Sequence, residues 1–152
     1  MSTVTSTATI IVSTQEELNV AYKALTAGSG GTILLEAGDT FNIAFSDWND
    51  TKTDASVTIR SYDVDNPATL THLDLLGREN LTVEHVKFHA SRDDLSTYQQ
   101  MLEITNSENI TIRNVELSSV ANGAMGTTDT NIDIGVSLGT LRGSQNVVFD
   151  SN

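Results

Sequence analysis

Asn80-Leu81-Thr82-Val83-Glu84-His85-Val86-Lys87-Phe88 occurs twice in this chain. The second copy, Asn109-Ile110-Thr111-Ile112-Arg113-Asn114-Val115-Glu116-Leu117, starts 29 residues after the first, and a third copy begins at Asn146-Val147-Val148-Phe149. In both full copies apolar residues alternate with polar ones, slip by one position at His85 or Asn114, and then alternate again. Alternation with a period of two is typical of a β-strand with one buried face. Each full copy therefore predicts a strand, a bend and a second, shorter strand.

The spacing of the copies along the sequence predicts how the strands are arranged, in addition to the strands themselves. Self-similarity every ~20–50 residues is the signature of stacked repeats. Further strand-like segments precede the copies, at 10–12, within 30–41, and at 41–45, 57–60 and 70–76. No second helical pattern interrupts the strands, so a doubly wound α/β fold is disfavoured. We expect an all-β solenoid.

One helix is expected near the N-terminus. Thr14 and Glu17 have the spacing of a capping box, and apolar residues follow at i, i+3, i+4 and i+7. These apolar residues are Leu18, Ala21, Tyr22 and Leu25. Gly28 follows at the place where a left-handed helix C-cap is expected. Because the apolar stripe is one-sided, this helix should cover the first repeat, whose strand edge and core would otherwise be open.

Length and composition exclude several classes of protein. The 152 residues suit one domain, which we divide into a leading segment (1–12), a cap helix (13–28) and repeats (29–152). The net charge of −12 argues against nucleic acid and anionic membranes as partners. Without cysteine, the chain offers no disulfide, zinc thiolate or thiol nucleophile. No apolar run reaches the ~20 residues of a membrane span, so membrane insertion is not expected, and the N-terminus has no recognisable signal peptide.

Four segments resemble the pectin-lyase-like right-handed parallel β-helices: 13–18 (STQEEL), 30–38 (GGTILLEAG), 57–61 (VTIRS) and 80–83 (NLTV). They are similar to the N-terminal coils of alginate and chondroitin lyases, mannuronan epimerases and phage-type β-helical spikes. The resemblance implies a right-handed parallel β-helix with a short N-terminal capping α-helix. It implies no catalytic residue here, because catalytic groups of the family generally lie on later coils. The chain is accordingly expected to be the N-terminal part of a longer protein.

Three functions are open at this point. The first is a polysaccharide-engaging module of a cell-surface, secreted or phage-like spike protein, which binds and does not catalyse. The second is the N-terminal part of a polysaccharide lyase or uronate epimerase that acts on an acidic glycan, and the third is a particle-assembly adaptor. The expected location is extracellular or on a virion or particle surface. A homotrimer or coil-to-coil self-association is a further expectation.

Three residues are candidates for carbohydrate binding. Trp48, the single tryptophan, lies in a polar segment beside acids, where it would either stack on a sugar ring or anchor the loop. Lys87 and the strand-end His89 could face an acidic glycan, since lyases and epimerases need a cation and a base near the uronate. The repeat gives Lys87 a simpler role. It aligns Lys87 with Glu116, and Glu84 with Arg113, as cross-strand pairs of opposite charge.

Two further groups of residues carry side-chain oxygen atoms: three aspartates in one loop, and three asparagines at equivalent positions of the repeats. Asp47, Asp50 and Asp54 make an acidic loop that could hold calcium, although their spacing matches neither an EF-hand nor the glycine-rich calcium repeat. A solvated acidic loop is the alternative. The equivalent residues Asn80, Asn109 and Asn146 predict a ladder of stacked turns, because asparagine tolerates the left-handed backbone and bonds to its own turn.

Overall fold

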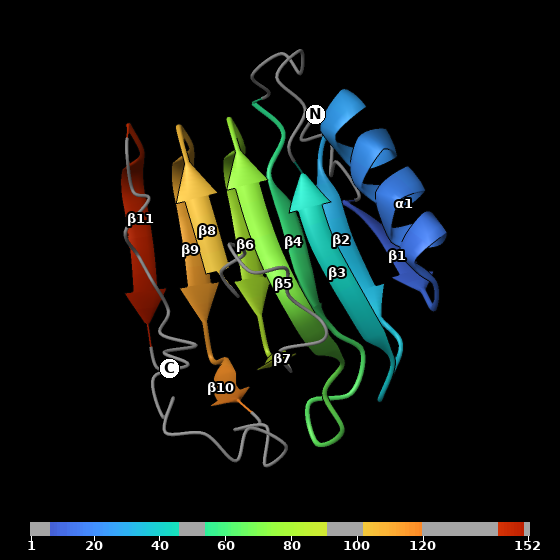
Figure 1. The fold of residues 1–152 in the computed structure, drawn as a ribbon. Helices are drawn as coiled ribbons and strands as arrows, with labels where there is room; N and C mark the ends of the chain where they lie inside the picture. The colour runs from blue at the N-terminus through green and yellow to red at the C-terminus, as the bar shows by residue number, and fades with distance from the viewer. Residues whose placement is uncertain (1–6, 46–53, 91–101, 120–142, 151–152) are drawn as a thin grey trace, which may run out of the picture.

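The structure is a computed structural model that describes residues 7–45, 54–90, 102–119 and 143–150. These residues form the helix α1 (Gln15–Ala27) and two parallel sheets (Figure 1). Sheet A contains, in spatial order, β1 (Ala8–Val12), β2 (Gly31–Leu35), β4 (Val57–Ser61), β6 (Glu79–Glu84), β9 (Glu108–Arg113) and β11 (Gln145–Asp150). Sheet B contains β10 (Glu116–Ser119), β7 (Lys87–Ala90), β5 (Thr69–Leu76) and β3 (Thr40–Phe45), with β8 (Leu102–Thr105) paired to the end of β5.

The core lies between the two sheets, which form separate layers in Figure 1. Period-two alternation points every second side chain inward, and parallel register places these side chains in rows across each sheet. One such row of sheet A is Ile33, Ile59, Val83 and Ile112, and one of sheet B is Phe41, Leu70 and Phe88; all are buried. Burying an aliphatic or aromatic side chain of this size contributes about 1.5–3 kcal/mol relative to leaving it exposed. The rows therefore hold the layers together.

Helix α1 covers the end of the core beside β1, as expected. The capping box is present: the Thr14 hydroxyl accepts a hydrogen bond from the Glu17 N–H, and the Glu17 carboxylate accepts one from the Thr14 N–H. The four stripe residues are buried, and the Tyr22 ring stacks on Phe45 with centroids 3.7 Å apart. The prediction that Gly28 has a left-handed conformation is wrong, since its φ is −104°. The left-handed glycine is Gly30, with φ 81°, whose N–H donates to the Leu25 carbonyl.

The predicted fold class, an all-β right-handed parallel β-helix, is wrong. The structure is a mixed α/β, sheet-rich fold in which α1 supplies part of the core, and neither of its two parallel sheets closes on itself. The reason lies in what a repeat determines. A repeated strand pattern specifies which strands pair and which faces they bury, but it does not specify closure of a sheet. The apolar stripe of α1 makes the helix a structural layer and not only an end cap.

The pairing between the copies is as predicted. β6 and β9 pair in parallel with Leu81 beside Ile110 and Glu84 beside Arg113. The expected bends lie at His85 and Asn114, with φ of 51° and 50°. Left-handed backbone of this kind costs most residues roughly 1–2 kcal/mol, and asparagine is among the few that adopt it routinely.

The asparagine ladder is also confirmed. Asn80, Asn109 and Asn146 have φ values of 54°, 55° and 52°. The Nδ2 of Asn109 donates to the Oδ1 of Asn80 at 2.9 Å, and the Nδ2 of Asn146 donates to the Oδ1 of Asn109 at 3.0 Å. The side-chain amides therefore connect β6, β9 and β11 in addition to the backbone hydrogen bonds.

Candidate functional site

Two of the predicted carbohydrate-binding residues lie together on β7. Lys87 and His89 are two positions apart and flank the buried Phe88, so both lie on the outer face of sheet B. The Nζ of Lys87 is 3.4 Å from Oε1 of Glu116, which confirms the predicted cross-strand pair. Lys87 thus has a structural partner, and the half-buried His89 lies beside it along the strand. Trp48 lies outside the described residues.

The predicted calcium ligands are placed only in part. Asp54 is exposed just before β4, while Asp47 and Asp50 lie outside the described residues. Among the residues that the structure describes, no group of three or more His, Cys, Asp or Glu side chains is arranged to hold a metal ion. Calcium binding stays a prediction.

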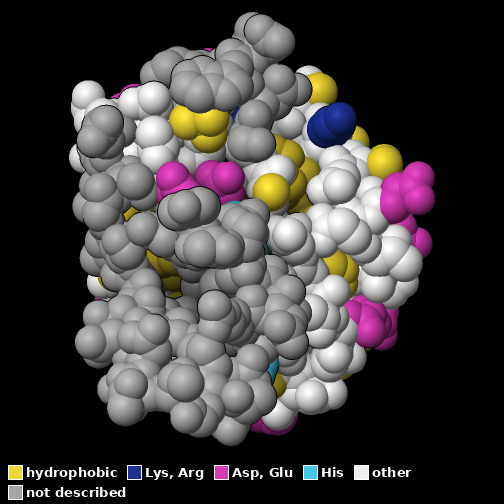
Figure 2. All heavy atoms as spheres, viewed as in Figure 1, with side chains coloured by type: hydrophobic (Ala, Val, Ile, Leu, Met, Phe, Trp, Pro, Cys, Tyr) yellow, Lys and Arg dark blue, Asp and Glu magenta, His cyan; other side chains and the backbone are white. Residues whose placement is uncertain are grey.

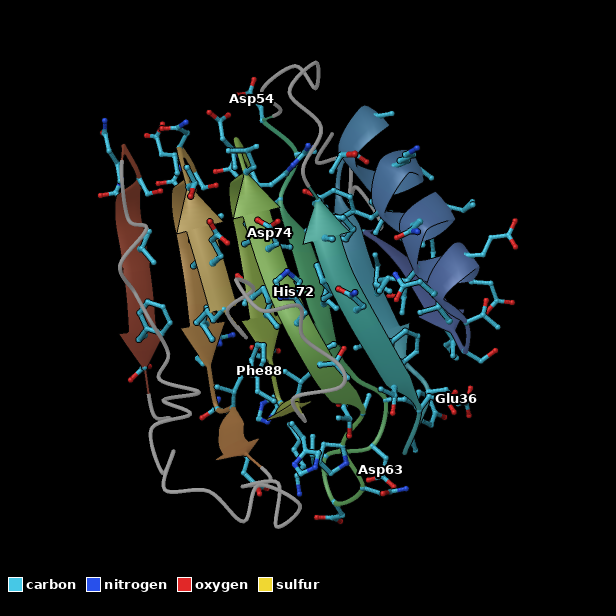
Figure 3. All side chains as sticks on the ribbon, viewed as in Figure 1. Glu36, Asp54, Asp63, His72, Asp74 and Phe88 are labelled. Carbon is cyan, nitrogen blue, oxygen red and sulfur yellow. The ribbon has the colours of Figure 1, made fainter. Side chains whose placement is uncertain are left out.

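Sheet B carries a second group of polar side chains, which the sequence did not indicate as a cluster. His72 and Asp74 project from the same face of β5 (Figure 3), and Asp74 is in register with Glu103 on β8. His72 is buried, although it is on the outer face. Acidic side chains recur over the described part of the face seen in Figure 2. The pairing follows the same 29-residue offset as the repeat, because Leu73 and Leu102 each lie seven residues before the repeated asparagine.

Within the part of the chain that the structure describes, the outer face of sheet A carries a regular row of polar side chains. Five threonines occupy one row across five neighbouring strands, each in register with the next. This threonine row consists of Thr9, Thr32, Thr58, Thr82 and Thr111, and Val148 follows on β11. Neighbouring strands lie about 4.7–4.9 Å apart, so the hydroxyls repeat at that distance along a line perpendicular to the strands. Within the described ranges, none of these five hydroxyls forms a hydrogen bond.

A charged row runs beside the threonine row, two residues further along each strand. It contains Arg60, Glu84, Arg113 and Asp150 in register, so the charges alternate in sign. The carboxylate of Glu84 accepts from Nε of Arg113 at 2.6 Å, and its other oxygen is 3.7 Å from Arg60. The Glu84 side chain is only 7% exposed, whereas the arginine side chains are 38% and 48% exposed. Two guanidinium groups therefore enclose one carboxylate.

The asparagine ladder forms a third row, two residues before the threonines. The three rows give the outer face of sheet A side-chain amides, hydroxyls and charges that are paired with opposite charges. Such groups form hydrogen bonds in both directions: a hydroxyl donates once and accepts twice, and an amide has two donors and an acceptor. This chemistry suits recognition of a polar ligand better than acid–base catalysis. The signal for the threonine row in the sequence was the threonine two positions after Asn80 and after Asn109.

Comparison with known proteins adds no assignment. No protein-family model, curated protein or solved structure matches the chain. The resemblance to pectin-lyase-like proteins therefore stays an inference from the residues. No helix in the described part of the chain has the length and apolar character that crossing a bilayer requires.

Proposed function

We propose that this protein binds a polysaccharide along the threonine row of sheet A and does not transform it. The observation that carries the proposal is the row itself: five hydroxyls in register, without a partner among the described residues, at a constant spacing. An extended polysaccharide is a repeating series of hydroxyl groups, so a repeating series of donors and acceptors can bind it at several points. The threonine methyl groups add apolar contact with the C–H faces of the sugars.

Electrostatics favour an uncharged polysaccharide. The net charge of −12 repels a polyanion at long range, although salt limits this effect to about 8–10 Å. Beside the threonine row, the two arginines are matched by Glu84 and Asp150, so the charged row offers no excess of positive charge to a uronate. The location that follows from the proposal is the outside of a cell or of a particle, where such polysaccharides are found.

Retention on immobilised polysaccharides tests the proposal. Neutral glucans, mannans and xylans are compared with alginate and pectin, using the full chain and the double variant Thr58→Val/Thr82→Val. Valine keeps the β-branched shape and removes only the hydroxyl. The matched control is Thr40→Val, which removes an exposed hydroxyl from β3 of sheet B.

Each hydrogen bond contributes about 0.5–1.5 kcal/mol, so loss of two should weaken binding roughly tenfold, with no change in the control. Unchanged binding by the double variant would show that the threonine row is not the binding surface. Failure of the full chain to bind any neutral polysaccharide would refute the proposed function.

A further inference from the structure

The outer face of sheet A carries an exposed aromatic residue directly after β4. The inward residues of β4 are buried, so Thr58 and Arg60 point outward, and Tyr62 continues this alternation. The N–H of Tyr62 donates to the Leu35 carbonyl at 2.8 Å, which extends the pairing of β4 with β2 by one residue. Tyr62 is 56% exposed, so more than half of this residue is accessible to a ligand.

The backbone that carries Tyr62 is held at both ends of the segment between β4 and β5. Its first residue is held by the hydrogen bond to β2, and at its end the Ala68 N–H donates to the buried Ser61 hydroxyl at 2.9 Å. Between these ends the Asp63 carboxylate accepts a hydrogen bond from the Asp65 N–H at 2.9 Å, which closes a turn. A side chain on such a segment loses little backbone freedom when a ligand binds, and this favours affinity.

The distance between Tyr62 and the threonine row determines which ligands reach both. Tyr62 lies four residues beyond Thr58, which is ~13 Å at the rise of about 3.3 Å per residue of a parallel strand. A linear polysaccharide along the threonine row runs perpendicular to the strands and therefore passes Tyr62 at that distance. A branch that leaves the main chain at Thr58 and follows β4 reaches Tyr62 after crossing the partly exposed Arg60, whose guanidinium group donates hydrogen bonds.

The side chains near Tyr62 suit an uncharged sugar. Asp63 and Asp65 are exposed in the same turn, and the exposed Glu36 follows β2 at the position that continues the register beside Tyr62. Carboxylates accept hydrogen bonds from hydroxyl groups, and an aromatic ring offers an apolar surface to the C–H face of a sugar. The same carboxylates repel a uronate. An aromatic residue with acceptors around it therefore favours a neutral sugar.

We propose that the polysaccharide on the threonine row is branched, and that Tyr62 stacks on a sugar of a branch that follows β4. Tyr62 is then a specificity-determining residue, which distinguishes branched from linear polysaccharides. This proposal rests on the polysaccharide binding proposed above, and it adds the class of ligand and a second point of contact.

Retention of the full chain on matched linear and branched polysaccharides tests the proposal. Linear mannan is compared with galactomannan, and unbranched xylan with arabinoxylan, so that only the branches differ. Tyr62→Ala removes the ring, and Tyr62→Phe keeps the ring and removes the hydroxyl. The matched control is Val64→Ala, which shortens an exposed apolar side chain in the same turn. Circular dichroism melting verifies that each variant is folded.

The wild type should bind each branched polysaccharide roughly tenfold more tightly than its linear counterpart, as expected for one aromatic contact. Tyr62→Ala should lose this preference and bind the linear polysaccharides as the wild type does, whereas Tyr62→Phe and Val64→Ala should retain the preference. Equal binding of branched and linear polysaccharides by the wild type, or an unchanged preference in Tyr62→Ala, would overturn the branch contact and leave the threonine row as the binding surface. Binding of neither kind by the wild type would overturn both proposals.

Discussion

Replacement of Glu84 by glutamine should destabilise the protein by about 1–2 kcal/mol. The Glu84 side chain is 7% exposed and contacts Arg113 at 2.6 Å and Arg60 at 3.7 Å. A hydrogen bond to a charged group contributes about 1.5–3 kcal/mol. Both arginines are more than a third exposed, so water and salt screen them and recover part of the lost interaction. Glutamine preserves the shape and one acceptor, which leaves the loss in the lower part of that range.

The matched control is Glu116→Gln. The Lys87–Glu116 pair has the same cross-strand geometry, but its atoms are 3.4 Å apart and Glu116 is 63% exposed. Pairs of this kind contribute about 0.2–1 kcal/mol, so the control should lose under ~0.5 kcal/mol. Urea unfolding measures both variants, with a shift of the midpoint at an unchanged slope as the sign of altered stability.

A double-mutant cycle with Arg113→Gln isolates the pair, and its coupling energy should be about 1 kcal/mol. Equal losses for Glu84→Gln and Glu116→Gln would refute the reasoning that burial makes the Glu84 pair the stronger one. A gain in stability on Glu84→Gln would show that the desolvation of Glu84 exceeds its attraction to the arginines.

Three further predictions concern the backbone and the helix cap. Asn109→Gly should cost about 1 kcal/mol because the ladder is broken, and Asn109→Val about 1–2 kcal/mol more because valine tolerates φ 55° poorly; urea unfolding measures both. Gly30→Ala should prevent folding or destabilise strongly in the circular dichroism melt, since φ is 81° and a Cβ would collide with the Ser56 carbonyl. Hydrogen bonds from the backbone and hydroxyl of Ser13, then from Thr14, hold the pKa of Glu17 below its ordinary 4.5 against a smaller opposing effect of desolvation. The stabilisation by the Glu17 carboxylate is therefore complete above pH 4.5 and is lost as the pH falls through the lower pKa of the folded state. The melting temperature of Glu17→Gln should therefore fall less than that of the wild type between neutral and acidic pH.

Each of these predictions has a contrary outcome. Equal stability of the glycine and valine variants at position 109 would show that its left-handed backbone is not a constraint. A Gly30→Ala protein with wild-type melting would contradict the close packing at Ser56. The control for the pH dependence is Glu16→Gln in the same helix turn, and an identical response of Glu16→Gln and Glu17→Gln would contradict the role of the cap hydrogen bonds.

The sequence predicted the features that short-range patterns determine. The repeat identified the pairing of Glu84 with Arg113 and of Lys87 with Glu116, and the equivalent asparagines identified the left-handed ladder. Thr14 and Glu17 located the start of α1. Each of these depends on residues in one strand pair or one helix turn, where spacing alone fixes the contact.

Features set by distant strands were not predictable in the same way. Closure of a sheet depends on the geometry of all its strands, and the prediction of an all-β right-handed parallel β-helix was wrong for that reason. Arg60 joins the charged row from β4, which has no leading asparagine to align it with the repeat. The first strands contribute to the threonine row at irregular intervals along the chain, so the row is visible only once the register is known.

Polysaccharide binding along the threonine row is tested most directly by nuclear magnetic resonance. The isotope-labelled protein is titrated with a neutral oligosaccharide, which is chosen from the retention experiment. The methyl groups of the five threonines report on the row one strand at a time. We predict shifts at several consecutive threonines, with Thr82 and Thr111 among them, and unshifted signals for Thr40 and Thr69 on sheet B. Shifts that are confined to sheet B, or scattered without relation to the row, would contradict this prediction.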